Sequence, residues 1–567
     1  MSNGADRTPY EIGLTMAGAA SAGTYAAGVV DFFLEALDRW HRAKKERPNE
    51  VPDHEVRLKV ISGSSAGGMT GALAAGLLSG QHSPITSLPG SEPTASTLQS
   101  NPLYEAWVEQ IDIHPLLGQQ DLSEETDRVV SLLDSSILDD IAETAIDFAP
   151  RNEPRSYVAD PLHLLLTVTN LKGVPYDITF EGNLDVPHRT ARHTDYKEFV
   201  LGRTAPSGGA ATWLDPSDPQ ARGWTTLQEY ALASGAFPGG LAPRPLTRNR
   251  ADYDDRRWTV PLRPQEDQPG RCRKRVPIQP SWGTDEPTSG EYRFLAVDGG
   301  AMNNEPFELA RQMLAGDDDF NSRAPTEATR SVLMVDPLPS ERAVGAVGPE
   351  DRDLPVVLKA LFGSLIAQAR FKPDELILAN SPQVYSRYLI VPTRRDSSGR
   401  RAEHPIASEM FGGFGGFLKK EFRIHDFQLG RRNCQQFLRR HFGIPRTHCN
   451  ENPVFSHYSS AALDRFCVER DGEEVMPIIP LVGEAASEEF PLNWDVLGMT
   501  DRELDTLQER VQGRAGRVLN RMVDQYVEGW LQSKLARFAA GRLAKDRVVK
   551  GIMSSVKADL KRYGLKR

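Results

Sequence analysis

The fold of this chain is decided by the stretch Leu58-Lys59-Val60-Ile61-Ser62-Gly63-Ser64-Ser65-Ala66-Gly67, in which a strand-like run ends in the pattern G-x-S-x-G. Beyond it, Met69, Leu73 and Leu77 recur every four residues, which predicts the buried stripe of a helix. A serine flanked by two glycines on a sharp strand-to-helix turn exposes its hydroxyl. Ser65 is therefore the candidate nucleophile, supported by Gly63 and Gly67. The pentapeptide alone does not separate this interpretation from tight packing of a helix on a sheet.

A second segment near the N-terminus has almost no side chains. The run Glu11-Ile12-Gly13-Leu14-Thr15-Met16 is typical of a strand and leads into Ala17-Gly18-Ala19-Ala20-Ser21-Ala22-Gly23. A helical stripe follows at Tyr25, Val29, Phe33, Leu37 and Trp40. Bare backbone N–H groups ahead of a helix stabilise negative charge, so this loop is a candidate anion-binding element. Close packing at a strand-to-helix turn is the alternative.

The third segment is Phe294-Leu295-Ala296-Val297-Asp298-Gly299-Gly300, an apolar strand that ends in an aspartate and two glycines. Open α/β sheets place ligands at the carboxyl ends of their strands, and Gly299 and Gly300 let the chain turn away there. We therefore predict that Asp298 meets Ser65. A solvated Asp-Gly turn is the alternative. Asp336, after the strand-like run 331–335, is a second candidate acid, but proline follows it instead of paired glycines.

Taken in order, these motifs resemble the patatin-like phospholipases, which are acyl hydrolases with a serine–aspartate dyad. Two further segments strengthen the resemblance: Ala233-Ser234-Gly235-Ala236-Phe237-Pro238 is similar to the family's alanine-serine segment with its Phe-Pro turn, and Asn304-Glu305-Pro306 is similar to its Asn-x-Pro. The motifs span roughly residues 10 to 310, with long unmatched stretches between them.

The resemblance implies that Ser65 attacks an ester carbonyl and that Asp298 accepts its proton. It also implies that backbone N–H groups of Gly18, Ala19 and Ala20, with a contribution from Ala66, hold the oxyanion. An exposed aspartate is a poor base at neutral pH, so the site must desolvate Asp298 or hold it against the hydroxyl. A Ser-His-Asp triad is an alternative esterase mechanism.

The glycine loop departs from the family pattern. Where the family has Gly-Gly-Gly-x-Arg-Gly, this chain has Gly18-Ala19-Ala20-Ser21-Ala22-Gly23, so two glycines are alanines and the basic residue is Ala22. An alanine held at positive φ would be strained by about 1–2 kcal/mol. This departure raises another hypothesis, a catalytically silent domain that binds lipid or a protein partner.

Composition limits the remaining function classes. The 567 residues carry a formal net charge of −10, which gives no support for a nucleic-acid partner. The four cysteines, at positions 272, 434, 449 and 467, form no C-x-x-C pair, which favours a reducing compartment. No apolar run is long enough to span a bilayer, so we predict a soluble, cytoplasmic protein. Its partner is a lipid ester substrate; the motifs call for no cofactor.

The predicted architecture is a three-layer α/β/α fold with a mainly parallel central sheet. We assign residues 1–345 to the hydrolase core, with insertions near 79–150 and 247–292, and residues 346–509 to a continuation of the core or an accessory region. The 79–150 insertion contains helical segments that either cover the site or only support the fold. The Gly-aromatic stretch 411–417 is either a substrate wall or a loop packed on the core.

Two features of the C-terminal part suggest ligands. Two cysteines and three histidines lie between residues 434 and 457, but their spacing matches no closed tetrahedral zinc pattern, so we assign no metal. Residues 510–567 are basic, with an apolar stripe at three- and four-residue spacing from Val518 to Phe538. Such a helix contacts an anionic membrane surface, packs on its own domain or pairs with another subunit. The sequence does not give the oligomeric state.

Overall fold

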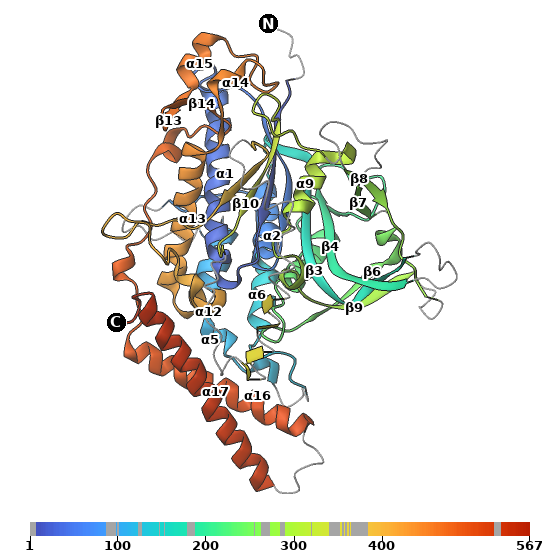
Figure 1. Ribbon diagram of the computed structural model, residues 1–567, viewed down its shortest axis with the longest axis vertical. Coiled ribbons are helices and arrows are strands. Elements are labelled where there is room, and N and C mark those ends of the chain that lie inside the picture. The colour runs from blue at the N-terminus through green and yellow to red at the C-terminus, as the bar shows by residue number, and fades with distance from the viewer. Residues whose placement is uncertain are drawn as a thin grey trace.

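A computed structural model of the chain shows a twisted sheet with helices on both faces (Figure 1). The residues that the structure describes are 7–86, 98, 101–122, 128–146, 148–151, 153–178, 188–254, 256–261, 273–283, 290–318, 320–339, 352–353, 356–357, 360–361, 363–364, 384–526 and 534–567.

The central sheet follows the order β11-β10-β1-β2-β3-β4-β5; β9 also pairs with β3, and β6 pairs with β9. The pairs from β11 through β3 are all parallel, whereas β3 pairs antiparallel with β4. The sheet is therefore large and mostly parallel, as predicted. Its strands are β1 (Tyr10–Met16), β2 (Val56–Gly63), β3 (Val158–Ile178), β4 (His188–Leu201), β5 (Thr212–Leu214), β6 (Arg244–Asn249), β9 (Glu291–Asp298), β10 (Arg330–Val335) and β11 (Arg387–Ile390).

Alternate side chains of the inner strands pack on opposite layers. On one face, Val60, Leu165 and Val332 form a cluster with α9 (Phe307–Ala315). On the other, their chain neighbours join the main core, which includes α1 (Gly23–Glu46) and α2 (Ala66–Ser79). This period of two is expected for strands buried on both faces. The three-layer α/β/α prediction is confirmed.

Two strands approach each other head to head along one edge of β3. β2 runs parallel to β3 and ends where Gly63 pairs with Leu166. β9 runs the opposite way and ends where Asp298 pairs with Val168. β4 occupies the other edge of β3 at this level, so both ends lie on the same edge. Two residues along a strand span about 7 Å, so the segments that leave β2 and β9 start close together.

The C-terminal third contributes a long helix to the helical layer that contains α1. In α13 (Lys420–Arg440), Gly430 approaches α1 so closely that a Cβ there would lie 2.2 Å from the Tyr25 carbonyl oxygen. The fully buried Arg431 forms ion pairs with Asp31, Glu35 and Glu489. At least this part of region 346–509 is thus packed directly on the first helix of the fold.

The insertions and the rest of the chain form shorter elements. Between α2 and β3 lie α4 (Pro102–Tyr104), the π-helical turn η2 (Glu105–Gln110), α5 (Ile113–Leu116), η3 (Gln120–Leu122) and α6 (Ser136–Ala145); α7 (Arg222–Ser234), η4 (Arg250–Tyr253), β7 (Arg257–Pro261), β8 (Arg273–Pro277), α8 (Gly300–Asn303) and η5 (Gly316–Asp318) follow. After β11 come η7 (Ala407–Glu409), α12 (Met410–Gly413), η8 (Gly415–Leu418), β12 (Gly443–Pro445), α14 (Arg446–Cys449), α15 (Ser460–Phe466), β13 (Val468–Arg470), β14 (Glu473–Pro477), η9 (Gly483–Ala486) and η10 (Trp494–Val496).

The chain ends in two helices that lie side by side, α16 (Asp501–Tyr526) and α17 (Lys534–Arg562) (Figure 1). The apolar stripe predicted from Val518 to Phe538 is divided between them, and residues 527–533 lie outside the described residues. Leu507 of α16 and Met553 of α17 belong to one buried cluster with Met410. The described parts of these helices therefore pack on their own chain. No helix among the described residues is long and apolar enough to cross a membrane.

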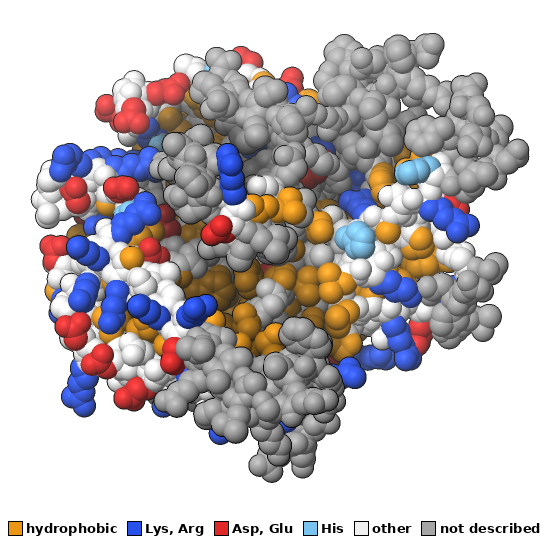
Figure 2. Space-filling model, turned by 60° about the horizontal axis from the view of Figure 1, so that its bottom comes forward, with side chains coloured by type: hydrophobic (Ala, Val, Ile, Leu, Met, Phe, Trp, Pro, Cys, Tyr) orange, Lys and Arg blue, Asp and Glu red, His pale blue; other side chains and the backbone are white. Residues whose placement is uncertain are grey.

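Hydrophobic side chains gather around a hollow at the end of the molecule where α6, α12 and the two C-terminal helices lie. Figure 2 looks onto this end and shows the hydrophobic surface with Lys and Arg side chains at its margins.

Candidate active site

Ser65 stands on the turn between β2 and α2, in a backbone conformation that serine rarely adopts. Its φ of 53° and ψ of −127° lie outside the common regions, and such strain is typical of functional turns. The turn passes close to β1: a Cβ on Gly67 would lie 2.3 Å from the Met16 carbonyl oxygen. Glycine is therefore required at position 67 for steric reasons, and the local geometry is that of a nucleophile elbow.

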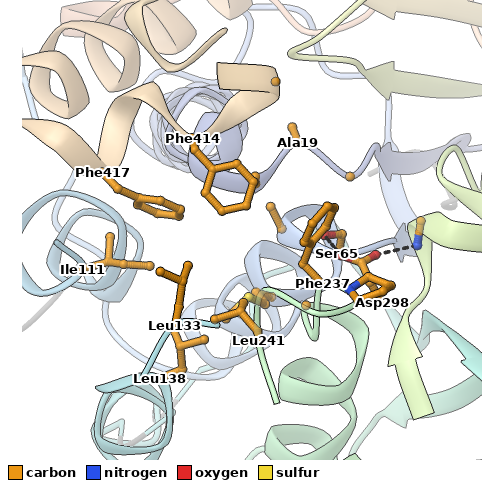
Figure 3. Close-up of a pocket in the computed structure, with 18 of the residues that line it drawn as sticks. Ala19, Ser65, Ile111, Leu133, Leu138, Phe237, Leu241, Asp298, Phe414 and Phe417 are labelled. Atoms are coloured by element: carbon orange, nitrogen blue, oxygen red, sulfur yellow. Dashed lines mark hydrogen bonds between the residues drawn. The ribbon is translucent and has the colours of Figure 1, made fainter. Parts of the chain in front are cut away.

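Asp298 meets Ser65 directly. The Ser65 hydroxyl Oγ donates a hydrogen bond to Asp298 Oδ2 at 2.5 Å, and the Gly300 N–H donates to Oδ1 at 2.6 Å (Figure 3). Burial raises the pKa of Asp298 from its usual 3.8 to about 6, although these two hydrogen bonds act in the opposite direction. Asp298 is 4% exposed and Ser65 7%, so the pair is shielded from bulk water.

Ser234, at the end of α7, connects the nucleophile turn with the acid turn. Its Oγ accepts the Ser65 N–H at 2.9 Å, and its carbonyl oxygen accepts the Gly299 N–H at 3.1 Å. One residue thus fixes the backbone on both sides of the Ser65–Asp298 contact. The alanine-serine segment marked the position of Ser234 in the sequence, but nothing in that pattern connects Ser234 with both turns.

The glycine loop lies against the serine. A Cβ on Gly18 would lie 2.8 Å from Ser65 Cβ, so no larger residue fits there. The Gly18 N–H donates to the Asn304 carbonyl oxygen at 3.1 Å and is therefore engaged away from the oxyanion position predicted for it. Ala19 and Ala20 line the pocket in front of Ser65. Ala20 has a φ of 44°, so the strain foreseen for an alanine in this loop falls on this residue.

Ala66 is the fourth predicted donor. As the first residue of α2, it carries one of the N–H groups that have no acceptor within the helix, and it lines the same pocket. Ala19, Ala20 and Ala66 thus all line the pocket next to Ser65. That their N–H groups hold an oxyanion stays a prediction.

The pocket at Ser65 has apolar walls that come from distant parts of the chain. Phe237 lies three residues after Ser234. Its ring packs edge-on against that of Phe414, with 5.6 Å between the ring centroids, and the rings of Phe414 and Phe417 pack at 5.8 Å. These rings line the cavity together with Ile111, Leu133, Leu138 and Leu241 (Figure 3). Both insertion 79–150 and stretch 411–417 therefore line the pocket. The sequence could not show this, because apolar residues that line a cavity and those that fill a core follow the same pattern.

Ser21 connects the glycine loop to stretch 411–417. Its Oγ donates to the Gly413 carbonyl oxygen and accepts the Gly416 N–H at 2.9 Å. The stretch thus supports the loop from behind in addition to lining the pocket.

Other candidate groups lie elsewhere. All twelve histidines are among the described residues, and none of them lines this pocket. Asp336 accepts the Leu338 N–H through Oδ1 at the end of β10, whereas the Ser65 hydroxyl points to Asp298. Within the described part of the chain, no group of three or more His, Cys, Asp or Glu side chains is arranged to hold a metal ion. Cys449 is buried, and that burial raises the pKa of its thiol to about 12.

The chain matches one protein family and is similar to proteins of other organisms. A family model described as patatin-like phospholipase matches residues 14–311, which include Ser65 and Asp298. "Uncharacterized protein y4iI" of Sinorhizobium fredii (strain NBRC 101917 / NGR234) is 33% identical over 563 residues, covering 92% of this chain and 77% of that protein. The crystal structure of VipD from Legionella pneumophila aligns over 98% of this chain and 87% of that chain, at 10% identity and a TM-score of 0.25.

The fold is thus that of an α/β/α hydrolase with a serine elbow. The chain belongs to the patatin-like phospholipase family, a family of lipid acyl hydrolases.

Proposed function

We propose that this protein hydrolyses acyl esters of lipids through a Ser65–Asp298 dyad and an acyl-enzyme intermediate. The observation that carries the proposal is the 2.5 Å hydrogen bond from Ser65 Oγ to a buried carboxylate, at the bottom of an apolar pocket. Asp298 is the only residue with an ionisable carboxyl, amino or imidazole group among the described residues that line this pocket. Proton transfer from Ser65 therefore has one candidate acceptor there.

In this mechanism, Asp298 takes the hydroxyl proton as Ser65 attacks the ester carbonyl carbon. A pKa near 6 leaves the carboxylate mostly ionised at pH 7 and makes it a stronger base than an exposed aspartate. The developing oxyanion is held by the N–H groups of Ala19, Ala20 and Ala66, and the leaving alcohol takes the proton. Water then attacks the acyl-enzyme while Asp298 accepts a proton from it, and Asp298 passes this proton to Ser65 Oγ as the carboxylic acid leaves.

The dyad is tested by two substitutions that change only its reacting groups. Ser65→Ala and Asp298→Asn should both lose nearly all hydrolysis of p-nitrophenyl butyrate while keeping the wild-type circular dichroism spectrum. Asp336→Asn is the matched control, because it alters a second aspartate at a strand end outside the pocket and keeps an acceptor for the Leu338 N–H. Full activity of either dyad variant would refute the mechanism.

The altered glycine loop supports a second candidate, a catalytically silent domain that binds lipid. The observation in its favour is Ala20, a non-glycine residue held at positive φ beside the nucleophile. A fluorophosphonate probe separates the two functions, because it labels only an activated serine. Labelling of wild type but not of Ser65→Ala supports the enzyme, and no labelling of either supports the silent domain.

Peripheral contact of residues 510–567 with a membrane stays a prediction. The second half of α17 carries exposed basic residues such as Lys550 and Lys557. Co-sedimentation of the full chain with anionic but not with neutral liposomes is the expected result. Substituting exposed lysines of α17 by glutamine should reduce it, and equal sedimentation with both kinds of liposome would exclude an electrostatic contact.

A further inference from the structure

The last helix of the chain is connected to the glycine loop through one hydrogen bond. Asp559, on α17, accepts the Phe411 N–H through Oδ2 at 3.0 Å. Two residues further on, Gly413 lies against the loop: a Cβ there would lie 3.2 Å from the Ala19 carbonyl oxygen and 3.3 Å from Ala20 Cβ. A single residue therefore separates the position that Asp559 holds from the position that touches the loop.

The backbone at Phe411 adopts a conformation that its surroundings must maintain. Phe411 has a φ of 56° and a ψ of 35°, and Gly412 has a φ of 65° and a ψ of 32°, so the chain is left-handed at both residues. Glycine adopts this conformation freely, whereas a phenylalanine in it is strained. A strained residue keeps its conformation only where neighbouring groups fix it. The Asp559 carboxylate is such a group, because a hydrogen bond to a charged acceptor is stronger than one to a neutral oxygen.

Packing against the same helices fixes the preceding residue. Met410 is fully buried in a cluster that includes Leu507 of α16 and Val556 and Leu560 of α17. The short helix α12, which contains Met410, contacts α17 (Figure 1). The start of stretch 411–417 is therefore held from the C-terminal helices in two ways, by apolar packing and by the hydrogen bond to Asp559.

Ser21 connects the position of this stretch to that of the glycine loop. The Ser21 side chain is buried, and its Oγ donates to the Gly413 carbonyl oxygen and accepts the Gly416 N–H at 2.9 Å. The preceding residue, Ala20, is itself at positive φ. A displacement of Gly413 would therefore break a buried hydrogen bond or move the loop beside Ser65. A misplacement of about 1 Å at a reacting group can cost about a hundredfold in rate.

We propose that Asp559 is a positioning residue for the glycine loop, so that α17 is required for the full catalytic rate. This inference rests on the proposed function, in which Ala19 and Ala20 hold the oxyanion. Asp559 acts through Phe411 and Gly413 and does not line the pocket at Ser65. Because the oxyanion exists only after attack, misplacing its donors should lower kcat and leave KM unchanged.

Kinetics of two variants at position 559 test this role. Asp559→Ala removes the acceptor and should lower kcat for p-nitrophenyl butyrate about tenfold or more, with KM within about twofold of wild type. Asp559→Asn keeps an oxygen acceptor for the Phe411 N–H and should retain more than about a third of the wild-type kcat. Asp546→Asn, at an exposed position on the same helix, is the matched control and should have wild-type kinetics. Each rate is divided by the folded fraction from circular dichroism, which removes any loss of activity through unfolding.

Amide hydrogen exchange separates failure of this inference from failure of the proposed function, because it requires no reaction. In Asp559→Ala, peptides that cover residues 18–23 and 411–417 should exchange about tenfold faster or more, whereas peptides from β2 should exchange as in wild type. If wild type hydrolyses no ester but this difference appears, the proposed function fails and the positioning role stands. Unchanged exchange of residues 18–23 would overturn the inference. With an active wild type, an unchanged kcat in Asp559→Ala or equal losses in Asp559→Ala and Asp559→Asn would overturn it too.

Discussion

Replacing Asp298 by asparagine should abolish hydrolysis and stabilise the protein. The ionised carboxylate is fully buried, and burial raises its pKa from 3.8 to about 6. Asparagine has nearly the same shape; its Oδ1 can accept the Gly300 N–H and its Nδ2 can donate to Ser65 Oγ. The substitution thus removes the buried charge and keeps both hydrogen bonds.

The magnitude follows from linkage. Raising the pKa of one carboxyl from 3.8 to about 6 corresponds, at 1.36 kcal/mol per pH unit, to about 3 kcal/mol at neutral pH. The sign is unfavourable to the native state: between about pH 4 and 6, the folded protein binds a proton that the unfolded chain has released. Stability is therefore lost as the pH rises through this window. Above pH 6, both states are ionised and the full destabilisation is present.

Paired urea titrations of wild type and Asp298→Asn from pH 4 to 8 measure this difference. Tryptophan fluorescence and circular dichroism should give coincident transitions, which justifies a two-state free energy. We expect the variant to be more stable by about 3 kcal/mol at pH 7, with the difference shrinking toward zero near pH 4. A difference that does not depend on pH, or a less stable variant at pH 7, would refute the idea that Asp298 is held ionised against its burial.

Three further results are expected. The kcat/KM for p-nitrophenyl butyrate should fall about tenfold per pH unit below an apparent pKa near 6, because protonated Asp298 cannot act as the base; a profile that is flat from pH 5 to 8 would argue against this role. Ser234→Ala should leave the buried Ser65 N–H without its acceptor, at a cost of about 1–3 kcal/mol in stability, and lower kcat/KM; wild-type kinetics would show that Ser234 does not position the turn. Ala20→Gly should relieve strain and raise stability by up to about 1 kcal/mol in the same urea assay, unless the φ of 44° is unstrained, in which case stability falls.

Much of the fold was predictable because strand, turn and helix patterns agreed locally. Gly63, Ser65 and Gly67 gave a strand-to-helix turn with a candidate nucleophile, and Asp298 with its two glycines gave a second strand end. The direction of β9 was not predictable. Its apolar run fits a parallel or an antiparallel neighbour equally well, and only the pairing of Asp298 with Val168 shows that it approaches β2 head to head.

The residues that form the pocket walls could not be predicted from the sequence, for a different reason. Leu138 and Phe414 line the pocket and belong to segments for which the sequence left two interpretations open. Insertion 79–150 could cover the site or only support the fold, and stretch 411–417 could be a substrate wall or a loop packed on the core. Both kinds of position demand apolar side chains, so periodicity cannot separate them. The glycine loop 18–23 was predictable only in part. Strain was expected for an alanine at positive φ, and Ala20 is that residue. The hydrogen bond from the Gly18 N–H to Asn304 was not predictable, because it joins residues that are distant in sequence.

The meeting of β2 and β9 on one edge of β3 also sets when the chain acquires its reactive centre. The hydroxyl and the carboxylate are 233 positions apart, and the ribosome makes the serine first. Until β9 has been synthesised and has paired with β3, the elbow has no base beside it. A growing or truncated polypeptide that stops before Asp298 thus carries an inert serine, and the cell's lipids are exposed to the proposed chemistry only after β9 has docked.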